Sequence, residues 1–298
     1  MSRAVLIVNP YSTNVDRARV VAVETALRTR VEVDTAFTEG PGHATQLAAD
    51  AAARAEAIVV FSGDGTYNEV LNGIDGAVPV GFLPGGGTSV FARALGLPRD
   101  PVKAAAQVGD ALAEGRSRRI SLGCVNGRRF CFSAGIGLDG EGVRRLNALG
   151  RAPGGARPGD LRFARVFAGM VVEQRGRWPD TLEVEGYGRA AFVLVANGDP
   201  YSYAGPIALH VAPEARFELG LDFVAPTRVV PRSVPRLVGL MLRRGGRRRM
   251  TGLLAGHDLD RIEVRCDRPL PLQADGEDLG DVELATFEAE RDAVAVLV

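Results

Sequence analysis

Lysine is almost absent from this chain. It occurs once in the 298 residues, at Lys103, so arginine carries nearly all the positive charge. The usual nucleotide-binding P-loop places a lysine after its glycines to reach the phosphates, and no Gly-x-x-x-x-Gly-Lys-[Ser/Thr] run occurs. The sequence therefore excludes a phosphate site of the usual P-loop type.

Cysteine and histidine are also scarce. Cys124, Cys131 and Cys266 are odd in number and lack the paired spacing of metal ligands, which argues against a disulfide framework and a structural zinc site. We expect them to be small buried residues. The three histidines follow no carboxylate–histidine–serine order of a hydrolase triad, so we expect them on the surface or in loops.

Long apolar runs and an excess of charge are lacking too. No apolar segment approaches the ~20 residues of a transmembrane helix, and the first residues lead into an apolar strand without the pattern of a signal peptide. The formal net charge is zero, so no overall field draws the chain to nucleic acid. We expect a cytoplasmic protein without a nucleic-acid partner, and leave peripheral contact with the inner face of the cell membrane open.

Glycine, in contrast, is abundant, and its most informative occurrence is Ser62-Gly63-Asp64-Gly65-Thr66. An apolar run precedes this segment directly, so a buried strand would deliver a glycine-rich turn to the start of a helix. Gly63 and Gly65 let backbone N–H groups approach a phosphate closely. Thr66 is a candidate helix cap, and Asp64 is a candidate ligand for Mg²⁺, which prefers oxygen.

A second glycine-rich segment, Pro84-Gly85-Gly86-Gly87-Thr88-Ser89, follows another apolar run and opens another helix. A single glycine run is more often an ordinary loop. Two such segments at the carboxyl ends of neighbouring parallel strands would face one nucleotide. The pair, rather than either segment, predicts a phosphate site.

The first part of the chain alternates apolar runs with helical periodicity, which predicts a parallel α/β sheet. We expect strands at 4–8, 31–37, 57–61 and 78–82, and helices at 15–29, 44–53, 66–74, 90–95 and 101–114.

After Gly115 the pattern changes to short strands separated by Gly, Pro or Asp, which predicts an antiparallel β domain. We expect strands at 118–123, 129–134, 182–185, 190–196, 207–211, 221–224, 262–266 and 270–274, and helices at 161–173 and 233–242. The apolar residues 293–298 are expected to return to the first domain.

Five short motifs occur one after another along the chain. They are Asn9-Pro10; Gly63–Thr66 with Asn68-Glu69 and Asn72-Gly73; Pro84–Thr88 with Phe91-Ala92-Arg93 and Leu95-Gly96; Gly135–Asp139; and Asp275-Gly276-Glu277. In this order, the set resembles the diacylglycerol kinase catalytic-domain family of lipid kinases. Each motif is weak alone, but together they span most of the chain.

The resemblance implies an α/β fold with two domains. The first would be a Rossmann-like, parallel-sheet, ATP-binding domain formed by residues 1–117, to which residues 286–298 return. The second would be an antiparallel β-sandwich domain for the lipid substrate, formed by residues 118–285. Lipid would enter between the two.

The resemblance also implies a set of site residues. Those assigned to the nucleotide are Asn9, Thr38, Ser62, Gly63, Asp64, Gly65, Thr66, Asn68, Glu69, Gly86, Gly87 and Thr88. Asp64 would bind the metal and share in catalysis. Glu277 occupies the position of the proton acceptor, and Asp275 beside it competes for the same role.

Three positions depart from the family pattern. The first motif glycine is Ser62, the second segment reads Ser89-Val90 where many members carry Asn-Asp, and Ser121 stands where members carry an Asp before a glycine. In some family members, carboxylates at the last two positions belong to a water-mediated Mg²⁺ network. Without them, Mg²⁺ binding would depend more on Asp64.

The expected activity is transfer of the γ-phosphate of ATP, with Mg²⁺, to the hydroxyl of diacylglycerol or a similar long-chain lipid alcohol. An NAD kinase is the main alternative because that family shares a Gly-Gly-Asp-Gly-Thr loop and a related fold. A nucleotide- or lipid-binding regulator without catalysis is the second, and the three departures favour it.

An arginine cluster follows the apolar residues 238–242. Its members are Arg243, Arg244, Arg247, Arg248 and Arg249. Such a cluster would meet the anionic headgroups of a membrane, and a solvated surface loop explains it about as well. The sequence leaves the oligomeric state open, a homodimer included.

Overall fold

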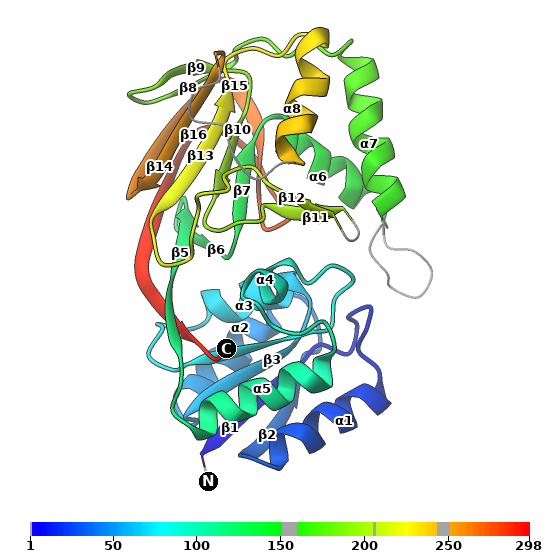
Figure 1. Cartoon of the computed structure of the whole chain (residues 1–298), viewed down its shortest axis with the longest axis vertical. Coiled ribbons are helices and arrows are strands. Elements are labelled where there is room, and N and C mark those ends of the chain that lie inside the picture. The colour runs from blue at the N-terminus through cyan, green and yellow to red at the C-terminus, as the bar shows by residue number, and fades with distance from the viewer. Residues whose placement is uncertain (1, 151–159, 205–206, 243–250) are drawn as a thin grey trace. The chain divides into compact units, whose positions relative to one another are not determined.

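The computed structural model describes residues 2–150, 160–204, 207–242 and 251–298. The chain forms two compact units, Met1–Leu122 with Arg291–Val298 and Gly123–Glu290 (Figure 1). Strand β5 (Arg118–Val125) runs from the first unit into the second. The arginine cluster at 243–249 lies outside the described residues.

The first unit is built on a parallel sheet. Its strands are β1 (Arg3–Val8), β2 (Glu32–Phe37), β3 (Ala57–Ser62) and β4 (Val80–Pro84), in the order β4-β3-β1-β2. Every residue of β3 is buried, as is typical of parallel strands that are covered on both faces. This confirms the parallel sheet that the alternating sequence pattern predicts.

Helices follow these strands as the sequence predicts. They are α1 (Arg17–Arg28), α2 (His43–Ala52), α3 (Asp64–Asn72), α4 (Val90–Ala94) and α5 (Pro101–Ala113). Aspartates fix the starts of two of them, because the Asp16 carboxylate accepts from the Arg19 N–H and the Asp100 carboxylate accepts from the N–H groups of Val102 and Lys103.

Helix α3 begins two residues earlier than expected. Its N-cap is Gly63, with an extended backbone, and Asp64 already belongs to the first turn. The prediction that Thr66 caps this helix is therefore wrong. The chain passes from β3 into α3 through a single glycine, which places the Thr66 hydroxyl inside the first turn.

The C-terminal residues return to the first unit, as predicted. The long strand β16 (Glu277–Val296) pairs in parallel with β4 at Val296 and Val80. The Leu297 N–H donates to the Val80 carbonyl at 2.9 Å. The chain end thus extends the parallel sheet beyond β4.

The second unit is dominated by antiparallel strands, as the sequence predicts. They are β5, β6 (Arg128–Phe130), β7 (Ser133–Ile136), β8 (Leu182–Val184), β9 (Gly188–Ala190), β10 (Val193–Ala196), β11 (Ser202–Ala204), β12 (Ile207–Leu209), β13 (Leu221–Pro226), β14 (Leu253–Leu259), β15 (Arg261–Ala274) and β16. The main path runs β14-β13-β10-β7-β15-β16. The described helical elements are α6 (Leu138–Ala148), α7 (Asp160–Glu173), the 3-10 turn η1 (Pro231–Ser233) and α8 (Val234–Met241).

Several element boundaries differ from the expectation. The strands expected at 129–134 and 190–196 are each divided in two, whereas those expected at 262–266 and 270–274 form the single strand β15. A register shift between Arg265 and Leu270 marks the irregularity that the intervening residues introduce. Helix α6 and strands β11 and β14 were not expected, and of β16 only the last residues were.

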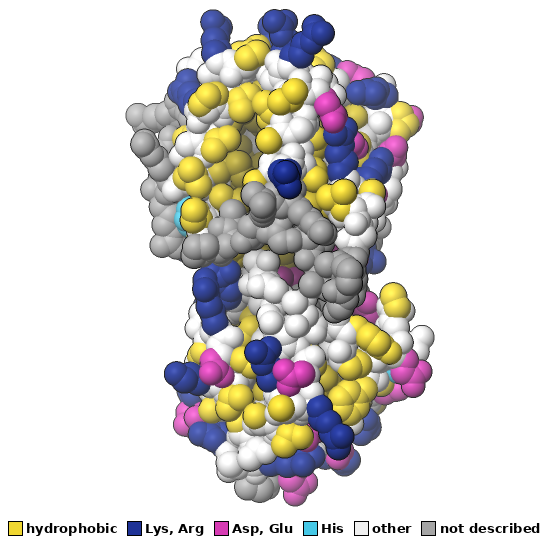
Figure 2. All heavy atoms as spheres, turned by 90° about the vertical axis from the view of Figure 1, so that its right-hand side faces the viewer, with side chains coloured by type: hydrophobic (Ala, Val, Ile, Leu, Met, Phe, Trp, Pro, Cys, Tyr) yellow, Lys and Arg dark blue, Asp and Glu magenta, His cyan; other side chains and the backbone are white. Residues whose placement is uncertain are grey.

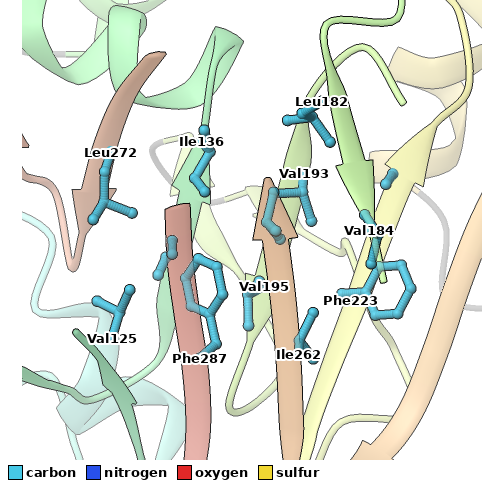
Figure 3. Packing of buried hydrophobic residues seen from close by; sticks show 14 of the residues in the cluster. Val125, Ile136, Leu182, Val184, Val193, Val195, Phe223, Ile262, Leu272 and Phe287 are labelled. Carbon is cyan, nitrogen blue, oxygen red and sulfur yellow. The ribbon is translucent and has the colours of Figure 1, made fainter. Parts of the chain in front are cut away.

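Buried apolar side chains from the strands fill the interior of the second unit (Figure 3). Phe287 of β16 is fully buried, and its ring meets that of Phe130 edge to face at a centroid distance of 6.5 Å. The three cysteines are free and buried, as predicted. None of the described helices combines the length and the apolar character that crossing a membrane requires.

Replacing Phe287 with Ala should lower the free energy of unfolding by about 3–5 kcal/mol, because the cavity left behind cannot fully collapse. Leu284 lies on the same strand but is 45% exposed, so Leu284→Ala should change the free energy of unfolding by no more than about 0.5 kcal/mol. Urea unfolding of both variants measures the difference. Equal losses would show that Phe287 is not a core residue.

Candidate functional site

The two glycine-rich segments meet at the carboxyl ends of β3 and β4. Ser62 pairs with Pro84 at the end of the two strands, and the Gly85 N–H donates to the Ser62 carbonyl at 2.7 Å. A Cβ on Gly63 would lie 3.2 Å from Gly86 Cα, and a Cβ on Gly86 would lie 2.8 Å from Gly63 Cα. Only glycine permits this backbone contact, so the two segments form one continuous surface.

The Asp64 carboxylate links the first segment to the helix that follows the second. Its two oxygens accept the backbone N–H groups of Val90 and Phe91, each at 2.9 Å. These donors open α4, a helix of five residues, and a carboxylate at a helix N-terminus is favourable. Asp64 therefore has a structural role that the sequence did not predict, and its role as a metal ligand stays a prediction.

A chain of polar side chains lies beneath the first segment. The Ser62 hydroxyl donates to the Thr66 hydroxyl at 2.7 Å and lies 2.8 Å from the Ser12 hydroxyl. The Asn9 amide also donates to the Thr66 hydroxyl, at 3.0 Å. The structure thus brings together the predicted residues Asn9, Ser62 and Thr66, and it gives the serine at the usual glycine position two hydroxyl partners.

Tyr67 supports both segments and was missed in the sequence. Its fully buried hydroxyl lies 2.8 Å from the Ser62 carbonyl and 2.6 Å from the Leu83 carbonyl. Its ring packs edge to face on Phe82 at 5.0 Å. A tyrosine directly after the glycine-rich turn was the available signal, because a buried phenol requires a partner for its hydroxyl.

The other residues assigned to the nucleotide differ in position. Glu69 accepts the Ala44 N–H at 3.2 Å, at the start of α2, and Asn68 is buried. Thr38 is 4% exposed at the end of β2, where its N–H donates to the Val8 carbonyl. Gly65 lies in the first turn of α3, while Gly87 and Thr88 are exposed in the second segment.

A protein-built metal cluster is not part of this arrangement. Among the described residues, no group of three or more His, Cys, Asp or Glu side chains is placed to hold a metal ion. The exposed backbone at Gly87 suits an anion instead, because nothing larger than hydrogen projects from it and no heavy atom lies within 4 Å of a Cβ built there.

In the second unit, Asp275-Gly276 forms the tight turn that joins β15 to β16. Both residues have positive φ, 50° and 79°, as the Asp-Gly pair of a two-residue hairpin commonly does. Asp275 is 2% exposed, and its carboxylate accepts three backbone N–H groups. The donors are Cys131 at 2.6 Å, Phe132 at 3.0 Å and Ser133 at 3.2 Å.

Glu277 is in a different environment from its neighbour. It is the first residue of β16, its side chain is 32% exposed, and it forms an ion pair with Arg128 of β6. Of the two carboxylates that compete in the sequence for the role of base, one is thus engaged by backbone donors and the other remains partly open to solvent.

A polar network near this turn was not predicted. The Tyr201 hydroxyl donates to Asp139 at 2.6 Å, and the Gln273 amide donates to the same carboxylate. Burial raises the pKa of Asp139 against the opposing effect of these hydrogen bonds. Burial and the nearby Asp139 raise the pKa of Tyr201 well above its ordinary value. The Gly135–Asp139 motif was the available signal.

Two histidines lie beside buried carboxylates. His210 lies 2.9 Å from the buried Asp199 carboxylate, and His257 lies 2.9 Å from the buried Asp222 carboxylate. His210 lies in the loop after β12, as expected, whereas His257 lies within strand β14 with its side chain 28% exposed.

A parallel sheet with paired glycine segments at the carboxyl ends of adjacent strands defines an α/β class of phosphate-binding proteins. Residues 3–125 match the model of the diacylglycerol kinase catalytic domain. The chain is 30% identical over 273 residues to the "Probable lipid kinase YegS-like" of Pseudomonas aeruginosa PAO1, which covers 88% of this chain and 83% of that protein. The chain belongs to the diacylglycerol kinase catalytic-domain family of lipid kinases.

Two further comparisons complete this result. The Bacillus subtilis diacylglycerol kinase is 43% identical over 110 residues, which is 36% of this chain and about a third (35%) of that enzyme's length. The crystal structure of a diacylglycerol kinase from Bacillus anthracis superposes with a TM-score of 0.73 over 99% of this chain and 96% of its own, at 18% identity. The second likeness concerns the fold alone.

The contact between the glycine segments predicts a sharp difference between two neighbouring positions. Gly86→Ala should lower the free energy of unfolding by about 1–3 kcal/mol, because its Cβ would press on the backbone at Gly63. Gly87→Ala meets nothing and should stay within about 0.5 kcal/mol of the parent. Urea unfolding of the two variants tests this, and a loss shared equally by both would refute the contact.

Proposed function

We propose that the protein is an ATP-dependent lipid kinase, which transfers the γ-phosphate of ATP to the hydroxyl of diacylglycerol or a similar long-chain lipid alcohol. The observation that carries the proposal is the backbone contact between the segments at Gly63 and Gly86. The lipid-kinase names of the relatives support it.

The phosphates of ATP would lie on the two glycine segments. Gly63, Gly65 and Gly87 have no side chain that would keep an anion from their backbone N–H groups, whereas the Gly86 N–H donates to the Ser89 hydroxyl at 3.2 Å. The N-terminal end of α3 adds a favourable dipole. Asn9, Thr66 and Ser62 fix the first segment from below, and Thr38, Asn68, Glu69 and Thr88 stay assigned to the surroundings of the nucleotide.

Mg²⁺ would enter with the ATP phosphates rather than occupy a site made by protein carboxylates. Its usual protein ligands number one or two carboxylates beside substrate phosphates and water. Asp64 is the candidate, although its oxygens also accept the α4 backbone. When bound, Mg²⁺ neutralises charge on the transferred phosphoryl group.

Glu277 is the catalytic residue we assign as proton acceptor. The hydroxyl of a lipid alcohol has a pKa far above 7, so a positioned carboxylate must take its proton as the oxygen attacks phosphorus. Arg128 orients Glu277 through their ion pair. Asp275, engaged with the three N–H groups, is a positioning residue that holds the turn.

The alternatives make different demands on substrate. An NAD kinase would phosphorylate a soluble dinucleotide, and a regulator would bind nucleotide or lipid without turnover. Labelled ATP and Mg²⁺ incubated with a panel of lipids, and with NAD in a parallel reaction, separates the three. We expect label in lipid only; label in NAD, or in neither, would reject the lipid kinase.

Membrane contact is a further part of the proposal. Lipid substrate resides in a bilayer, and the arginines of the 243–249 cluster would meet anionic headgroups there. This role for the cluster, and a homodimer, stay predictions.

The variants Glu277→Gln and Asp275→Asn should lose different properties, activity in the first and stability in the second. Glu277→Gln should lower kcat by about 10²- to 10⁴-fold because it removes general-base catalysis, with ATP affinity and unfolding midpoint retained. Asp275→Asn replaces an acceptor of three N–H groups by an amide and should lower stability by about 2–3 kcal/mol.

Kinetics at saturating ATP, together with urea unfolding, distinguishes the two outcomes. A stable Asp275→Asn protein with the larger loss of kcat would reverse the assignment of the base.

A further inference from the structure

Helix α8 is apolar on the side that faces the protein and also on the side that faces solvent. Val234 and Leu237 pack against Ala191, Phe192 and Val229, and Met241 packs against a second buried cluster. Yet none of the helix residues is buried. Arg236 is the one charged residue of α8, and a helix with so little polar surface normally lies in a core or in contact with lipid.

The outward side of α8 carries an apolar stripe. Pro235, Val238 and Leu242 are exposed and follow one another at helical spacing, with Val238 50% and Leu242 51% accessible. Figure 1 places α7 and α8 on the side that Figure 2 turns to the viewer, and hydrophobic side chains gather there with arginines among them.

The segment that carries this stripe has charge of one sign. Arg232 and Arg236 are exposed beside it, and neither makes an ion pair with any residue that the structure describes. Along the sequence, no Asp or Glu occurs between Asp222 and Asp258. In a chain with no net charge, such a segment is a local basic surface.

We propose that α8 docks the second unit on an anionic phospholipid bilayer. Val238 and Leu242 enter the boundary between headgroups and acyl chains, and Arg232 and Arg236 meet the lipid phosphates. This inference deepens the proposed lipid kinase function, on which it rests, by assigning the membrane contact to α8, its C-cap Leu242 and the preceding turn η1.

Charge complementarity selects a bilayer over a second copy of this chain. In a symmetric dimer through α8, each copy would present the same arginines to the other, with no acidic partner from the adjoining sequence. Anionic headgroups supply the opposite charge and accept the apolar stripe in the same layer.

The test measures sedimentation with vesicles of phosphatidylcholine, alone or mixed with phosphatidylglycerol, without ATP. Val238→Glu/Leu242→Glu should weaken binding to the mixed vesicles at least about tenfold, because apolar insertion is lost. Arg232→Gln/Arg236→Gln should weaken it about tenfold and reduce its salt dependence. Residues 243–250 are unchanged in all variants, so the differences report α8.

Val21→Glu is the matched control. Val21 is 54% exposed, also on a helix, but in the first unit, and its replacement should leave vesicle binding unchanged. Unfolding midpoints equal to that of the parent show that the variants fold. No binding by the parent, binding equal to the parent's in both double variants, or an equal loss in Val21→Glu would overturn the proposal.

Two further measurements separate this inference from its alternatives. Sedimentation velocity showing a dimer that Val238→Glu/Leu242→Glu dissociates, with vesicle binding unchanged, would assign α8 to a second copy and overturn bilayer docking. Activity on short-chain, detergent-dispersed diacylglycerol should be equal in the parent and that variant. Vesicle binding without any kinase activity would reject the proposed function and leave docking in place.

Discussion

The interaction on which the candidate site depends is that between the Asp64 carboxylate and the first backbone N–H groups of α4. It joins two segments that follow different strands, and it does so beside the contact of Gly63 with Gly86. Together the two segments form one glycine-rich backbone surface at the carboxyl ends of β3 and β4.

Much of the first unit was predictable because its apolar runs and helical periods alternate cleanly. The second unit was harder, since residues far apart in sequence decide its elements. Helix α6 contains Gly140 and Gly142, which lower helix propensity. The structure explains both: a side chain at Gly140 would collide with the Pro271 carbonyl and one at Gly142 with Phe167, so close packing rather than local preference selects them.

The candidate site shows the same limit. The sequence identified both glycine segments and the Asp275-Gly276-Glu277 turn, but gave Asp64 to a metal and left Asp275 and Glu277 as equals. The two carboxylates differ because the N–H groups of residues 131–133 donate to Asp275 and not to Glu277. These donors lie more than a hundred residues before Asp275 in the sequence. Such partners have no local sequence pattern. The same is true of Tyr201 and Gln273, which converge on Asp139.

The proposed nucleotide site requires the two glycine segments to act together through Asp64. Hydrogen–deuterium exchange with and without ATP tests it most directly, because exchange reports each segment separately. We expect ATP to slow exchange in residues 63–66 and 85–91 together, and Asp64→Asn to weaken the protection of both. Protection of only one segment, or protection of both unaffected by Asp64→Asn, would contradict it.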